Sequence, residues 1–239
     1  MPPYHPNYAL NEIRALSLKA AKGAGLDWGL AEDAAFGTVF LCRYGFDGCG
    51  ALIKLLDHLL QYPAAQLKPN HSAADNQSRI LRATHGLSPL YAGIALLDRA
   101  RQSNALPITL SKLHTPLFIL PFIAELSKIW RIPLCAKTQH GTAHFNMAAD
   151  EPCFSFIADD PQKWHIASDL MIKKSVMAVD RVTDNIPDKI IDKRRNIAHR
   201  AYVDEDIMCE ILRLAHKIYA PATEESRLKG AGAGVTDHD

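Results

Sequence analysis

The sequence predicts an α+β fold in which helices precede and follow a mixed sheet. The first third of the chain carries apolar residues at three- and four-residue spacing, which is typical of amphipathic helices. The middle alternates short apolar runs with one helical segment, which favours strands around a helix. The last apolar pattern, residues 204–219, is helical again and precedes a Gly-rich tail.

Three helices are expected in the first quarter of the chain. Asn11 can cap the first helix, and the second covers residues 30–43. A loop is expected at residues 44–50, because its three glycines disfavour both helix and strand interiors. The third helix follows this loop, and residues 62–83 then show little periodicity and are expected to form a surface segment.

A central βαβ unit is expected next. Residues 107–113 and 132–138 have strand patterns, and Thr115-Pro116 begins the helix between them. Because a helix of this length connects the two strands, they should run parallel. A hairpin turn is expected at residues 139–141. The strand candidates that should continue the sheet in antiparallel fashion are residues 142–147, 152–158 and 169–179.

One domain is expected over residues 1–239. The chain has 239 residues and is 48% hydrophobic, which is enough for one sizeable core. Within this domain the sequence predicts a helical part at about residues 8–61 and a mixed α/β part at about residues 86–239.

The composition argues against a partner such as nucleic acid or a membrane, and a cytoplasmic protein is expected. The formal net charge is +1, so no strong field attracts nucleic acid or a membrane surface. No secretory signal is apparent, and the longest apolar run, residues 116–124, is far shorter than the roughly 20 residues of a membrane helix. A homo-oligomer is left open.

The cysteines indicate reduced thiols and no metal site. Their number is odd, no pair has C-x-x-C spacing, and most lie within apolar patterns. The five are Cys42, Cys49, Cys135, Cys153 and Cys209.

The C-terminal tail is the least ordinary local sequence. Gly230 and Gly232 could expose backbone N–H groups to an anion, and Arg227, next to Ser226, could add a bidentate fork for a carboxylate or phosphate. The alternative is a disordered terminus, since chain ends fray unless they are held. No nucleotide-binding fingerprint, P-loop or nucleophile-elbow motif is present in the sequence.

Several blocks are similar to a bacterial family catalogued only as domain of unknown function 3726. The resemblance implies no assigned activity and no catalytic residues, but it implies that the tail belongs to the domain. The blocks are residues 10–13, 19–33, 88–98, 115–122 and 219–239.

Two other segments resemble the non-Rossmann malate/lactate dehydrogenase family, which includes ureidoglycolate dehydrogenases and cyclic-imine carboxylate reductases. Residues 45–50 resemble that family's Gly-x-Asp-Ser-His-Gly loop, with Gly48 and Cys49 in place of the Ser-His pair. His114 falls where a second family histidine would lie. The resemblance implies NAD(P)H as a cofactor and an altered acid–base position.

These observations leave three hypotheses on function open. They do not decide whether the chain is an enzyme. It could bind a small polar or anionic ligand, act as an NAD(P)-dependent reductase, or be a non-catalytic partner of a metabolic enzyme. The catalytic residues are unknown. Cys49 could equally be a buried thiol, His114 a helix cap and Asp47 a turn residue. The candidate ligand-binding residues are Asp47, Cys49, His114, Ser226, Arg227, Gly230 and Gly232.

Overall fold

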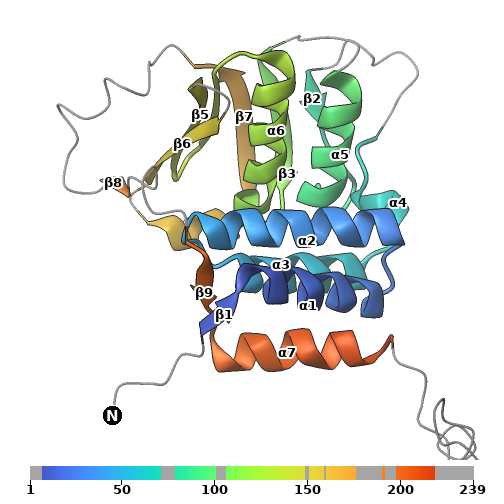
Figure 1. Ribbon diagram of the computed structural model, residues 1–239. Helices are drawn as coiled ribbons and strands as arrows, with labels where there is room; N and C mark the ends of the chain where they lie inside the picture. The colour runs from blue at the N-terminus through green and yellow to red at the C-terminus, as the bar shows by residue number, and fades with distance from the viewer. Residues whose placement is uncertain are drawn as a thin grey trace, which may run out of the picture.

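The computed structural model describes residues 7–70, 79–100, 106–148, 151–158, 160–175, 190–191 and 198–218. For residues 146–148, 151–153 and 190–191 it describes the backbone alone. Figure 1 shows the ribbon of the chain, coloured from the N-terminus to the C-terminus.

The helices and strands alternate in the α+β pattern that the sequence predicts. The helical elements are α1 (Leu10–Gly23), α2 (Trp28–Arg43), α3 (Gly48–Gln61), α4 (Ala64–Leu67), α5 (Pro89–Ala100), η1 (Pro116–Ile119), α6 (Leu120–Trp130), η2 (Pro161–His165) and α7 (Glu205–His216). The strands are β1 (Asn7–Ala9), β2 (Ile80–Leu81), β3 (Ile108–Leu113), β4 (Leu134–Thr138), β5 (Gly141–Ala148), β6 (Glu151–Ala158), β7 (Ser168–Lys174), β8 (Ile190–Ile191) and β9 (Arg200–Tyr202).

The molecule has a helical layer beside a sheet that is covered by two further helices. Helices α1, α2, α3 and α7 stack on one another, while α5 and α6 lie side by side against the sheet (Figure 1). Helix α2 lies between the two parts and contacts both α5 and α6. Buried apolar residues form one cluster that runs from α1 through α2 into β4, β5 and β6. The helical layer and the sheet therefore share a core.

The sheet is mixed, with strand order β2-β3-β7-β4-β5-β6-β8. β2 and β3 are parallel, and all other neighbouring strands are antiparallel. The two strands of the predicted βαβ unit run parallel, as predicted, but they are not neighbours in the sheet. β3 and β4 both pair antiparallel with β7, so they run parallel to each other with β7 between them.

Three local predictions differ from the structure. Asn11 does not cap α1, which begins at Leu10 directly after β1, and β1 pairs with β9 near the far end of the chain. Residues 48–50 are helical rather than loop, because Asp47 accepts a hydrogen bond from the backbone N–H of Gly50 at 2.7 Å and caps α3. The predicted strand at 169–179 ends at Lys174, and residues 176–179 lie outside the described part of the chain.

An aromatic cluster joins the helical layer to the sheet. The Tyr44 and Phe46 rings, which follow α2, pack edge-on against Phe154 of β6 at 5.3 and 6.0 Å between centroids. Phe156, two residues farther along the same strand, contacts both Phe46 and the buried Trp164 of η2. This packing fixes the segment between α2 and α3 against η2.

Candidate functional site

Helix α3 carries a polar edge on an otherwise apolar helix. Lys54, His58 and the C-cap Tyr62 are spaced four residues apart, which places them on one side of the helix, and Asp47 caps its N-terminus. Lys54 and Asp47 are exposed, whereas His58 is only 5% exposed. A histidine that is almost wholly buried on a polar edge must face a neighbouring element.

That neighbour is the turn between β3 and η1. The turn is irregular, because Lys112 and Thr115 both have left-handed backbone conformations with φ of 48° and 46°. The carboxylate of Asp169 on β7 accepts a hydrogen bond from the Lys112 N–H at 2.7 Å. The backbone N–H of His114 donates to the Leu87 carbonyl at 2.9 Å. These bonds hold His114 over α3.

The His58 and His114 rings stack face to face. Their centroids are 3.9 Å apart and their planes differ by 12°. The Nε2–H of His58 donates to the His85 carbonyl at 3.2 Å, while Nδ1 is buried without a partner among the described residues. The Thr115 hydroxyl lies 2.8 Å from Nδ1 of His114, and when it donates there the neutral ring carries its proton on Nε2. The pair thus offers the Nδ1 of His58 as an acceptor and the Nε2–H of His114 as a donor.

Both histidines of the stack are neutral at pH 7. Burial lowers the pKa of His114 from 6.5 to about 4, helped by the repulsion that a protonated His58 would exert and by the charge of Lys54. Burial also lowers the pKa of His58, although its hydrogen bond to the His85 carbonyl opposes this shift. Two stacked imidazolium rings would repel each other, so the neutral forms are consistent with the 3.9 Å contact.

A small cavity lies between the start of α3, η1 and η2, and its lining residues include neither His58 nor His114. It lies at Asp47, which precedes His58 by about 16 Å along α3. Its volume is about 110 Å³, and its lining includes Asp47, Leu117, Gln162 and His165. His165 is 8% exposed, and its Nδ1 has no partner in the described part of the chain. Burial lowers the pKa of His165, Lys54 lowers it further and Asp47 opposes both. The positive charge of Lys54 therefore lowers the pKa of both His114 and His165.

We use the name histidine site for Asp47, Lys54, His58, His114 and His165. It combines one ammonium group, one carboxylate and three neutral imidazoles. Within the described residues, no group of three or more His, Cys, Asp or Glu side chains could hold a metal ion. Together these groups can donate and accept hydrogen bonds.

Three of the predicted ligand-binding residues lie in different surroundings, and their binding role stays a prediction. Asp47 lines the small cavity, and His114 lies in the stack. Cys49 is 2% exposed and pairs with Cys42 of α2, and this hydrogen bond together with burial raises the pKa of its thiol. A side chain at Gly48, where the resembled dehydrogenases have serine, would clash with the Thr38 carbonyl. This turn therefore packs more closely against α2 than a Ser-His pair would permit.

The remaining predicted residues, Ser226, Arg227, Gly230 and Gly232, lie outside the described residues and stay predictions. Conversely, the sequence analysis missed Lys54, His58 and His165. The i, i+4 spacing of Lys54 and His58 on an apolar helix was an available signal. His165 had none, because it reaches the site only through the packing of η2.

A family model described as "Protein of unknown function (DUF3726)" matches residues 8–81. This match confirms the resemblance over the helical layer up to β2. The other similar blocks, including the tail, lie beyond the matched residues. Among curated proteins, none matches this chain.

Solved structures extend the comparison to most of the chain. The sulfolactate dehydrogenase from Methanocaldococcus jannaschii aligns over 89% of this chain and 97% of its own, with a TM-score of 0.56 and 9% identity. A malate dehydrogenase from Pyrococcus horikoshii OT3 aligns over 83% of this chain and 60% of its own, with a TM-score of 0.48 and 9% identity. The likeness to the first protein is one of fold, in agreement with the dehydrogenase resemblance of the sequence.

Proposed function

We propose that the chain binds a small organic acid at the histidine site. The observation that carries this proposal is the neutral His58–His114 stack with an unpartnered nitrogen beside Lys54. Buried polar atoms without partners are uncommon in folded proteins, and a ligand with matching hydrogen-bonding groups would satisfy them.

At the stack, charge and hydrogen bonding favour a carboxylate, because Lys54 is one helical turn from His58 while Asp47 lies about 16 Å before it along α3. The ammonium of Lys54 would attract the carboxylate, and the Nε2–H of His114 would donate to one of its oxygens. A hydroxyl next to the carboxylate could donate to an open Nδ1, on His58 or on His165. A hydroxy acid would thus use the donors for its carboxylate and an acceptor nitrogen for its hydroxyl.

The size of the cavity limits the ligand. Drug-sized ligands occupy pockets of about 300–1,000 Å³, whereas the cavity at the start of α3, lined by Asp47 and His165, has about 110 Å³. A ligand that also enters this cavity can have only a few non-hydrogen atoms, which favours acids of the size of lactate or glyoxylate.

The expected result is that lactate binds more tightly as the pH falls. A bound carboxylate favours the imidazolium form of His114, so binding takes up a proton that the free protein, with a His114 pKa of about 4, does not hold at pH 7. Isothermal titration of lactate at pH 7.5 and 5.5 should give a higher affinity at pH 5.5. The Lys54→Met variant should bind about tenfold more weakly.

The matched control is Lys128→Met, which removes an exposed lysine of α6. This variant should bind lactate like the natural chain. Equal losses in the two lysine variants, or an affinity independent of pH, would contradict the proposal.

A second candidate is a nicotinamide-dependent reductase. The observation that favours it is the fold shared with a sulfolactate dehydrogenase over 89% of the chain, together with a histidine after β3. A dinucleotide does not fit the cavity of about 110 Å³ among the described residues, so we derive no step through this cofactor.

For this candidate we expect turnover far below about 10 per second, the median for ordinary enzymes. Cys49 is buried against Cys42, so no acid–base group occupies the position of the family's loop histidine. Loss of a positioned acid–base group costs about 10²–10⁴ in rate. Oxidation of NADH and NADPH with a panel of 2-keto acids and cyclic imines measures the activity. Turnover near the median would show that another residue, such as His58, supplies the proton.

A further inference from the structure

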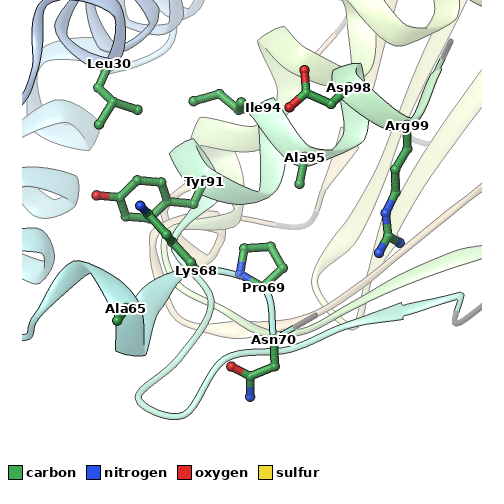
Figure 2. Close-up of a pocket in the computed structure, with 10 residues that line it drawn as sticks. All are labelled: Leu30, Ala65, Lys68, Pro69, Asn70, Tyr91, Ile94, Ala95, Asp98 and Arg99. Atoms are coloured by element: carbon green, nitrogen blue, oxygen red, sulfur yellow. The ribbon is translucent and has the colours of Figure 1, made fainter. Parts of the chain in front are cut away.

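A second and larger cavity lies between α2, α4 and α5, and the histidine site shares no lining residue with it. Its volume is about 710 Å³, within the range of ligand pockets (Figure 2). Helix α5 supplies one wall with Tyr91, Ile94, Asp98 and Arg99, and Leu30 of α2 adds an apolar side chain. The segment after α4 supplies Lys68.

The apolar residues of the cavity suit a hydrophobic group. Figure 2 shows Leu30 and Ile94 beside Tyr91, with the polar ends of Asp98 and Arg99 farther along α5. The ammonium of Lys68 lies over the Tyr91 ring, 5.1 Å from its centroid. Lys68 is therefore held at the cavity by its aromatic partner.

The charged groups of the cavity are of both signs. Lys68 and Arg99 are cationic and Asp98 is anionic. Asp27, at the N-cap of α2, is also close enough to raise the pKa of Tyr91, after the larger effect of burial. A simple anion would be repelled by the carboxylates, and a simple cation by Lys68 and Arg99. A molecule that carries both charges avoids this conflict.

We propose that this cavity binds a free amino acid with a large apolar side chain. The α-carboxylate pairs with Lys68 and Arg99, and the α-ammonium pairs with Asp98. The side chain packs against Leu30, Ile94 and Tyr91. This ligand differs in both charge and size from the small acid proposed for the histidine site, so the two proposals stand independently.

The experiment uses the full chain and three probes that share the same phenethyl skeleton. L-phenylalanine carries both charges, 3-phenylpropionate lacks the ammonium group, and phenethylamine lacks the carboxylate. Isothermal titration should show L-phenylalanine binding at least about tenfold more tightly than either analogue. Similar binding of 3-phenylpropionate or phenethylamine would overturn the zwitterion proposal, as would no binding of L-phenylalanine up to about 10 mM.

Two variants test which side chain pairs with which charged group of the ligand. Asp98→Asn should weaken L-phenylalanine about tenfold and leave 3-phenylpropionate unchanged, whereas Lys68→Met should weaken both. Both side chains are exposed, so the fold should persist, and an unchanged melting temperature checks this. Lys128→Met is the control for Lys68→Met, and equal effects of the two would overturn the assignment. Lys54→Met should keep L-phenylalanine binding although it weakens lactate binding.

Discussion

Replacing Gly23 with alanine is expected to lower the free energy of unfolding by about 2–3 kcal/mol. Gly23 is the last residue of α1, where α7 crosses it. An added Cβ would clash with the carbonyl oxygen of Leu214 and lie 2.8 Å from its carbonyl carbon. These are backbone atoms within α7, so they cannot move aside as a flexible side chain could. Urea unfolding followed by circular dichroism measures the change.

Gly29→Ala is the matched control. Gly29 lies in the first turn of α2, and an added Cβ there meets nothing within 4 Å. Because alanine favours helix over glycine by up to about 1 kcal/mol, this variant should be as stable as the natural chain or more so. Similar stabilities for the two variants would show that α7 does not pack on α1 as closely as the structure has it.

The parts of the fold that the sequence predicts well have local causes. Ser88-Pro89 resembles a helix start, and α5 begins at Pro89. Asp204 caps α7 through the Asp206 N–H at 3.0 Å. At Asp47 a similar cap extends α3 over glycines that composition alone assigns to a loop. One side-chain hydrogen bond there outweighed the intrinsic preference of glycine.

Long-range pairing could not be predicted. β7 lies between β3 and β4, yet it follows β4 by some thirty residues and two intervening strands. No periodicity within 107–138 signals this insertion. β1 is a short strand whose only described partner is β9, from the other end of the chain. Such pairings depend on tertiary packing, which a local pattern does not contain.

The residues of the candidate site also divide into those that a local sequence pattern can predict and those that only tertiary packing brings together. The resemblance to a dehydrogenase loop singled out Asp47, which lines the small cavity, and His114, which stacks on His58, and their role in ligand binding stays a prediction. It also singled out Cys49, whose side chain turns to Cys42 in the core because α3 begins earlier than the loop predicts. His58 joins His114 only through the packing of α3 against the turn between β3 and η1. A histidine stack of this kind is visible only in three dimensions.

The stability of the chain is expected to fall as the pH decreases from about 6.5 to about 4, partly through His114. Above pH 6.5 the ring is neutral in both states and its titration adds nothing. Between pH 6.5 and 4 the unfolded chain binds a proton that the folded chain, with a His114 pKa of about 4, does not bind. The full difference corresponds to about 3 kcal/mol, and screening of this partly exposed ring reduces it to about 1–2 kcal/mol.

The His114→Gln variant tests this effect. Urea unfolding at pH 7.5 and pH 4.5 gives the loss of stability for each chain, and the loss should be smaller by about 1–2 kcal/mol in the variant. The comparison between two pH values removes any pH-independent cost of losing the stack with His58. The control is His199→Gln, which alters an exposed histidine before β9 and should lose as much stability as the natural chain. If His114→Gln lost as much as that control, His114 would not be held neutral by burial beside His58 and Lys54, and the proton uptake proposed for lactate binding would lack its physical basis.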